Sequence, residues 1–131
     1  MAQISELRRA TRYHVKWRAA LIAESKTPCY GYIKDISVTG ALLLSEKAMA
    51  QAKPVPSVEL HIEIPAKNAD KARVLTIMVR IVYAVFDNKE MLFRYGMDFR
   101  EYCQKSDAEF LGTHLTRYCQ PVLITNHSIH L

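Results

Sequence analysis

Apolar and polar residues alternate along much of this chain, and such alternation predicts β-strands with one buried face. The first run starts at Val15, where apolar side chains occupy every second position as far as Leu21. Lys16 and Arg18 take the opposite face. Further alternating or β-branched runs cover residues 29–36, 41–44, 58–64, 74–86 and 91–99. Proline, glycine and polar residues separate these runs, so we expect six short strands joined by turns.

The two longest runs also predict which side chains face the core. In the first, the expected buried residues are Leu75, Ile77, Val79, Ile81 and Tyr83. In the second, they are Met91, Phe93, Tyr95, Met97 and Phe99. Between the runs, residues 87–90 read Asp-Asn-Lys-Glu, which predicts a hairpin turn.

One helix is expected after the last strand. Ser106 and Glu109 have the spacing of a capping box, which satisfies free backbone N–H groups at a helix start. Apolar side chains then recur at helical spacing, at Phe110, Leu111, Leu115 and Tyr118, and Pro121 ends the pattern. The predicted fold is therefore all-β dominated: a six-stranded antiparallel β-barrel with a C-terminal α-helix that packs against it.

The chain has 131 residues, the size of one domain, and its composition shows no internal break. We expect three parts: a flexible basic N-terminal arm (1–13), a barrel with its closing helix (14–120) and a C-terminal tail (121–131). No apolar run approaches the roughly 20 residues that cross a bilayer, and no signal-peptide pattern opens the sequence. These features predict no transmembrane segment and a cytoplasmic protein.

Positive charge is concentrated near the N-terminus. The net charge is +5, and no acidic residue lies between Glu6 and Glu24. The cations of this segment are Arg8, Arg9, Arg12, Lys16 and Arg18. A local excess of cations favours an anionic partner, although a solvated basic segment that aids solubility has the same composition.

Several classes of function lack their motifs. The three cysteines are widely spaced and the five histidines are scattered, which indicates neither a disulfide framework nor a metal site. The sequence has no Gly-rich phosphate cradle, no HExxH pair and no nucleophile elbow. We therefore predict that the protein is not an enzyme and has no catalytic residue, metal ion or cofactor.

Two short motifs contain residues suited to ligand binding. Arg8 and Arg12 form Arg-x-x-x-Arg directly before the first strand. Residues 35–40 read Asp-x-Ser-x-x-Gly at the junction of the second and third strands. Each motif alone is common, because arginines are frequent here and Asp, Ser and Gly are ordinary turn residues. Their order around one hairpin of a predicted barrel is much more specific.

With these motifs, the chain resembles the PilZ domain family of bacterial receptors for cyclic di-GMP. The resemblance extends from about Leu7 to Tyr118, and residues 95–99 are similar to the family's closing-strand pattern of Gly-x-x-Phe. It implies that Arg8 and Arg12 grip guanine and phosphate, with Arg9 as an adjacent helper. Asp35, Ser37 and Gly40 are the remaining ligand-binding residues that it implies.

The chemistry of these side chains suits that ligand. A guanidinium forks onto phosphate or onto guanine O6 and N7, and it also stacks on a purine. The carboxylate of Asp35 accepts hydrogen bonds from guanine N1–H and N2–H₂, and the Ser37 hydroxyl donates or accepts. Gly40 allows a tight turn and a close approach of backbone.

The resemblance implies that binding of cyclic di-GMP is signalled to a downstream effector protein, in motility or biofilm control, by ordering of the N-terminal arm. The alternative is a protein-interaction adaptor on the same fold that does not bind nucleotide. A third interpretation, a basic barrel for single-stranded nucleic acid, requires exposed aromatic residues. Because Tyr83, Phe93, Tyr95 and Phe99 alternate like core residues, we expect no nucleic acid polymer as partner.

Overall fold

The computed structural model describes residues 10–23, 27–49, 58–68 and 71–123. Its strands are β1 (Tyr13–Ile22), β2 (Cys29–Ile36), β3 (Gly40–Ser45), β4 (Val58–Ile64), β5 (Arg73–Asp87), β6 (Leu92–Tyr102) and the short β7 (Gln120–Pro121). One helix, α2, spans Lys105–Tyr118. The six predicted strands and the predicted helix are thus confirmed, and β5 and β6 are longer than the sequence pattern indicated.

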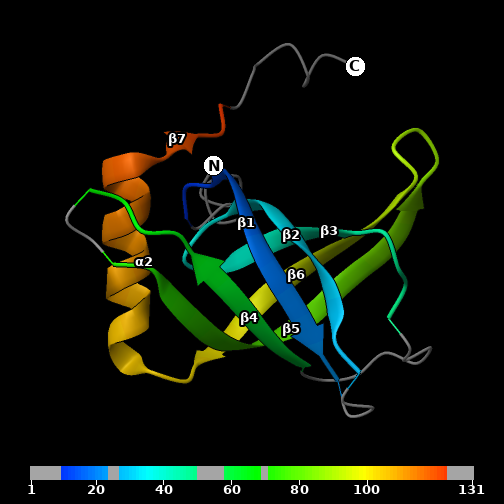
Figure 1. Cartoon of the computed structure of the whole chain (residues 1–131), viewed down its shortest axis with the longest axis horizontal. Coiled ribbons are helices and arrows are strands. Elements are labelled where there is room, and N and C mark those ends of the chain that lie inside the picture. Colours follow the sequence, from blue (N-terminus) through cyan, green and yellow to red (C-terminus); the bar gives the residue numbers. More distant parts are fainter. Residues whose placement is uncertain (1–9, 24–26, 50–57, 69–70, 124–131) are drawn as a thin grey trace, which may run out of the picture.

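The first six strands close into an antiparallel barrel. They follow the order β2-β3-β6-β5-β4-β1, and a further pairing of β1 with β2 closes the ring (Figure 1). β1 pairs with β2 along most of its length, and its second half also pairs with β4, from Ala19↔Ile62 to Ile22↔Glu59. Within the closed part of the barrel, each of β1 to β6 has a neighbour on both sides. Closure therefore removes the unpaired strand edges through which β-proteins commonly aggregate.

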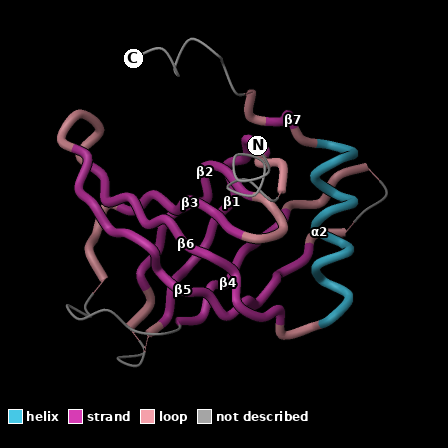
Figure 2. The backbone as a smooth tube through the Cα atoms, turned by 180° about the vertical axis from the view of Figure 1, so that it is seen from behind, coloured by secondary structure: helices cyan, strands magenta, loops and turns pink. Residues whose placement is uncertain are grey.

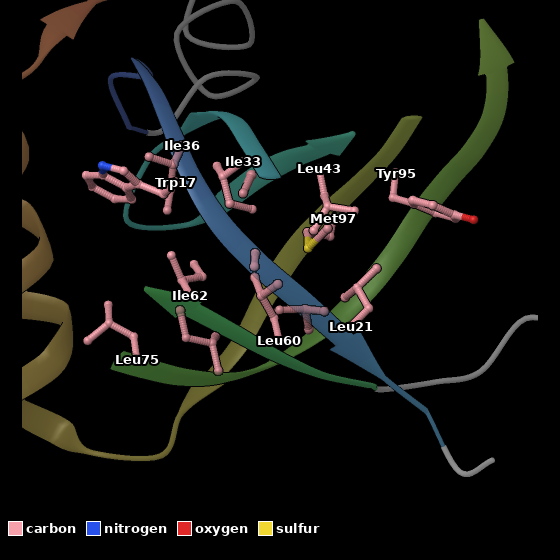
Figure 3. Packing of buried hydrophobic residues seen from close by; sticks show 14 of the residues in the cluster. Trp17, Leu21, Ile33, Ile36, Leu43, Leu60, Ile62, Leu75, Tyr95 and Met97 are labelled. Carbon is pink, nitrogen blue, oxygen red and sulfur yellow. The ribbon is translucent and has the colours of Figure 1, made fainter. Parts of the chain in front are cut away.

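Alternate residues of the strands fill the barrel. In β4 every second side chain is buried, from Val58 to Ile64, as the period of two requires. Figure 3 shows side chains from β1 to β6 meeting inside the barrel. Leu111 and Leu115 of α2 belong to the same core, so the helix covers this interior rather than standing apart. Trp17 is buried, as its place in the alternation predicted. The centre of its ring lies 5.7 Å from the centre of the His114 ring.

The capping-box prediction for α2 is wrong. The helix starts at Lys105 with Gln104 at the cap position, and no side chain caps it. Strand pairing continues close to this point, because the Cys103 N–H still donates to the Thr76 carbonyl at 3.0 Å. The chain therefore enters the helix too early for Ser106 to act as the cap. An ion pair fixes the first turn instead: the buried Asp107 lies 3.2 Å from Arg73 of β5.

The ends of β5 and β6 project from the barrel as a two-stranded hairpin, defined here as the hairpin arm (residues 82–92). An irregularity in the β5–β6 register between Ile81 and Tyr83 precedes it. Beyond that point both faces of β5 are exposed, so Tyr83 is 46 % exposed rather than buried. Met91 lies in the turn and is also exposed, so its predicted burial was wrong too. The hairpin turn itself is confirmed. The arm and α2 lie at opposite ends of the molecule (Figure 2).

The start of the predicted tail is paired with the barrel. Pro121 of β7 lies opposite Tyr13 of β1, and the Val122 N–H donates to the Arg12 carbonyl at 2.8 Å. The segment that enters β1 and the segment that follows α2 are therefore hydrogen-bonded to each other at Arg12. Most of the predicted N-terminal arm, residues 1–9, and residues 124–131 of the tail lie outside the described part of the chain.

Candidate ligand-binding site

The Asp-x-Ser-x-x-Gly motif forms the tight turn between β2 and β3. The Ser37 N–H donates to the Gly40 carbonyl at 2.8 Å, which closes the turn. The Ser37 hydroxyl accepts the Thr39 N–H at 3.0 Å and lies 3.1 Å from the Thr39 hydroxyl. Ser37 is only 2 % exposed, so its hydroxyl stabilises the turn. Its predicted direct contact with a ligand remains a prediction.

Arg12 and Asp35 form the centre of the site. The guanidinium Nη1 of Arg12 donates to Asp35 Oδ1 at 2.5 Å, across 23 positions of sequence. The pairing of β1 with β2 explains this meeting, because it sets His14 opposite Asp35 and leaves Arg12 just before the strand. The Asp35 side chain keeps 19 % of its surface exposed, so the charged pair is within reach of solvent.

Gly40 belongs to the same cluster because a side chain has no room there. A Cβ at this position would lie 2.7 Å from the Met97 carbonyl oxygen of β6 and 3.8 Å from Arg12 Nη2. No described glycine has a positive φ, so close approach rather than left-handed backbone accounts for Gly40. Three of the six predicted site residues, Arg12, Asp35 and Gly40, are thus brought together on one face.

The structure does not bring the other three predicted site residues into this cluster. Arg8 and Arg9 lie outside the described residues, so their predicted contacts with a ligand remain predictions. Ser37 belongs to the turn that carries Gly40, but its side chain is buried.

The structure adds an ion pair that the sequence analysis missed. Gly40 lies opposite Asp98 of β6, and Asp98 lies opposite Arg80 of β5. Arg80 Nη2 donates to Asp98 Oδ2 at 3.2 Å, with both side chains about half exposed. A cation and a carboxylate therefore continue the charged surface away from Gly40. Only the strand register produces this alignment, and no short motif in the sequence indicates it.

An aromatic ring lies further along the same outer face. Asp35 pairs with Leu42, Leu42 with Gly96, and Gly96 with Tyr83, so the four residues form one row across β2, β3, β6 and β5. A Cβ at Gly96 would lie 2.2 Å from the Tyr83 ring, which therefore covers this glycine. The result is a half-exposed aromatic surface in the same row as Asp35. Gly96 was noted as part of the closing-strand pattern, but its role as the seat of a ring was not predicted.

The turn is also connected to the helix. The Tyr102 hydroxyl donates to the Val38 carbonyl at 2.7 Å. Burial, with a smaller contribution from the nearby charge of Asp107, raises the pKa of Tyr102, so the hydroxyl keeps the proton that it donates. Val38 also lies beside Gly112 of α2, where a Cβ would be 3.5 Å from the Val38 methyl group. A displacement of the turn would therefore change the contact between Val38 and α2.

A separate groove of about 1280 Å³ runs over the outer faces of β1, β2 and the end of β3. Its wall includes Lys16, Arg18 and two aromatic residues, Tyr30 and Tyr32. Tyr30 is 71 % exposed, and the Lys16 ammonium lies 5.5 Å from the centre of the Tyr32 ring. None of the six predicted site residues lines this groove.

Together, the fold and this cluster define a small β-barrel domain with an arginine–carboxylate pair and a close-packed glycine turn on its outer face. The chain belongs to the PilZ domain family, whose sequence profile matches residues 6–119. The resemblance seen in the sequence is thereby confirmed. A search of curated proteins finds no match to the chain.

Solved structures with the same fold share little sequence with this chain. The inhibitor of motility MotI/DgrA of Bacillus subtilis superposes with a TM-score of 0.71 at 15 % identity, over 84 % of this chain and 50 % of that one. The K. pneumonia MrkH–c-di-GMP complex gives 0.59 at 14 %, over 83 % and 50 %. The PilZ domain of Escherichia coli YcgR with c-di-GMP gives 0.52 at 14 %, over 84 % and 92 %.

The chain thus spans about half the length of MotI/DgrA and MrkH. Among the described residues, no helix has the length and apolar character needed to span a membrane. The same residues contain no group of three or more potential ligands placed to hold a metal ion.

Proposed function

We propose that this domain binds cyclic di-GMP on the outer face where the chain enters β1 and where β2 turns into β3. The observation that carries the proposal is the contact between Arg12 and Asp35 beside Gly40. It joins one residue of each sequence motif, although the motifs are separated in the chain. Two of the solved structures with this fold are named as complexes with c-di-GMP, which supports the same ligand class.

Asp35 keeps the capacity to read guanine while it holds Arg12. A carboxylate offers about four acceptor positions, and the Arg12 contact uses Oδ1. Guanine N1–H and N2–H₂ are donors that match the remaining capacity. Arg12 is held in place by this contact and by its carbonyl bond to Val122, so its guanidinium is pre-oriented for guanine or phosphate.

Arg8 and Arg9 complete the proposed site from the N-terminal segment, as phosphate and guanine ligands that close over the dinucleotide. Ser37 and Gly40 hold the turn between β2 and β3 beside Asp35. These residues bind and position the ligand, and the proposal includes no catalytic step and no further cofactor.

The proposed signal is the ordering of the N-terminal segment on binding, read by a downstream effector protein in the cytoplasm. Two contacts support such coupling. The Arg12 carbonyl is bonded to Val122, and the Val38 carbonyl is bonded to Tyr102 next to α2. Ligand-dependent movement at either point would be passed to the C-terminal part of the chain. Roles in motility or biofilm control belong to this proposal as the expected outputs.

A second candidate function has one observation in its favour. The groove beside Tyr30 combines one exposed and one partly buried tyrosine with Lys16 and Arg18, and Glu46 and Glu90 also line it. Aromatic rings beside cations bind single-stranded nucleic acid by stacking. The prediction against this class rested on aromatic residues of β5 and β6, and not on Tyr30 and Tyr32. The adaptor that binds no nucleotide is the third outcome to be tested.

Calorimetric titration with cyclic di-GMP, cyclic di-AMP, GTP and a single-stranded oligonucleotide separates the three. Saturable binding to cyclic di-GMP alone supports the proposal, and silence toward all four supports the adaptor. Binding of the oligonucleotide that weakens steeply with salt, and that is lost on Tyr30→Ala, supports the groove.

Variants then test the site itself. Arg12→Ala and Asp35→Ala each remove a charged hydrogen bond, so each is expected to weaken cyclic di-GMP binding by about 1.5–3 kcal/mol, roughly 10- to 150-fold. Arg117→Ala, a loss of an exposed arginine in the last turn of α2, is the matched control and should leave the affinity unchanged. Equal losses for Arg12→Ala and Arg117→Ala, together with tighter binding for Asp35→Ala, would show that general charge, not this site, attracts the ligand. Equal proteolytic cleavage of residues 1–9 with and without ligand would refute the ordering step.

A further inference from the structure

The hairpin arm concentrates the exposed apolar surface of the described chain. Five of its eight exposed large hydrophobic side chains lie on the arm, namely Val82, Tyr83, Val85, Phe86 and Met91. The arm stands at the end of the molecule opposite α2 (Figures 1 and 2). A two-stranded hairpin exposed on both faces is only marginally stable in water, so contact with another surface would stabilise it.

The arm also offers a strand edge. β4 pairs with β5 from Arg73 to Val79 and no further in the part of the chain that the structure describes. β6 occupies the other edge of β5 as far as Asp87. The backbone from Arg80 to Phe86 therefore presents one edge to which another extended strand adds by hydrogen bonding.

We propose that this edge pairs with the same edge of a second copy of the chain, giving a two-fold symmetric dimer. An antiparallel pairing centred on Ala84 is compatible with two-fold symmetry, because each residue then lies opposite one on the same face. This pairing sets Tyr83 of each copy opposite Val85 of the other copy. Such aromatic–β-branched pairs are among the more favourable cross-strand neighbours. One sheet then runs through both barrels.

The surface available suits a weak, reversible contact with a second copy. The four apolar residues within the paired segment, Val82, Tyr83, Val85 and Phe86, expose at most roughly 350 Å² per copy. Two copies together reach about 700 Å² before the backbone edge is counted, which is the range of weak association rather than of a permanent interface. The dimer is thus expected to be reversible and to depend on concentration. This inference does not rest on the proposed ligand.

Sedimentation velocity of the full chain, from about 1 µM to about 500 µM, tests the proposal. The expected result is a reversible shift from the monomer mass of 15.0 kDa to twice that value and no higher. A monomer at every concentration overturns the proposal, and so does open-ended growth into larger species, because a two-fold pairing closes on itself.

Two valines of the same strand form a matched pair of variants. Val85 is 48 % exposed on the arm, whereas Val74 is 58 % exposed at the start of β5, where Glu63 of β4 is its pairing partner. Val85→Lys places a charge on the proposed interface and is expected to weaken the dimer at least tenfold. Val74→Lys should leave the dimer unchanged. Equal effects of the two variants overturn the assignment to the arm.

A measurement on the unmodified chain covers the case in which Val85→Lys does not fold. Amide hydrogen exchange within residues 80–86 should slow as the protein concentration rises, while exchange in β4 stays constant. If exchange in residues 80–86 is independent of concentration, the edge is not paired and the proposal fails.

Discussion

Three glycines of this domain differ in what a methyl group would meet, and this difference predicts an order of stability for their alanine variants. At Gly31 a Cβ would lie 2.1 Å from the Leu44 carbonyl oxygen, and at Gly40 it would lie 2.7 Å from the Met97 carbonyl oxygen. Both obstacles are backbone and belong to neighbouring strands. At Gly112 the nearest atom is a Val38 methyl carbon at 3.5 Å, an ordinary contact.

The distances set the expected magnitudes. A carbon atom normally stays about 3.3 Å from a carbonyl oxygen, so Gly31→Ala must move a strand by about 1 Å. The movement strains the β2–β3 pairing, and we expect a loss of about 3 kcal/mol or more in the free energy of unfolding. The smaller overlap at Gly40 predicts a loss of about 1–3 kcal/mol. Gly112→Ala fits a helix interior and should stabilise the protein by about 0.5–1 kcal/mol.

Urea unfolding followed by circular dichroism measures these differences, with the slope of the transition checked for constancy among the variants. In thermal melts, each kcal/mol corresponds to roughly 3–5 °C for a domain of this size. The reasoning is refuted if Gly31→Ala is as stable as the parent protein, or if Gly112→Ala is destabilised as much as Gly40→Ala. The first result would mean that β2 and β3 are spaced more widely in solution, and the second that α2 packs more tightly against Val38.

Two further predictions concern a hydrogen bond at the end of β6 and the ion pair between α2 and β5. Tyr102→Phe leaves the Val38 carbonyl without its donor and should cost about 1 kcal/mol at neutral pH, measured by urea unfolding. Because the pKa of Tyr102 is raised in the folded state, the stability that its hydroxyl contributes should be present below pH 10 and decline as the pH rises above that value. If the parent protein and the variant differ by the same free energy of unfolding at about pH 8 and pH 11, this prediction is contradicted. Asp107→Ala removes the buried partner of Arg73 and should lower the free energy of unfolding by about 1–2 kcal/mol. Asp98→Ala, at an exposed ion pair, should change it by less than about 0.5 kcal/mol. Equal losses would show that burial does not set the strength of these pairs.

The sequence alone determined the strands, because alternation of apolar side chains is a local property. Val58–Ile64 was predicted to the residue, and Trp17 was placed correctly in the core. The helix was found from its apolar spacing, but its start was not, because capping depends on where the preceding strand stops pairing. Burial was wrongly predicted for Tyr83 and Met91, since the alternation continues past the point where the barrel ends.

For the site, the sequence supplied the two motifs and the family, and so the residue types that suit a guanine dinucleotide. Only the tertiary structure decided which of them meet: strand register brings Arg12 onto Asp35 and sets Asp98 and Arg80 beside Gly40. It also decided that the Ser37 hydroxyl serves the turn, and that β5 leaves the barrel with an open edge. These are relations between residues far apart in the chain. A local pattern fixes the direction of a side chain relative to its own strand, whereas barrel closure fixes which strand lies next to it.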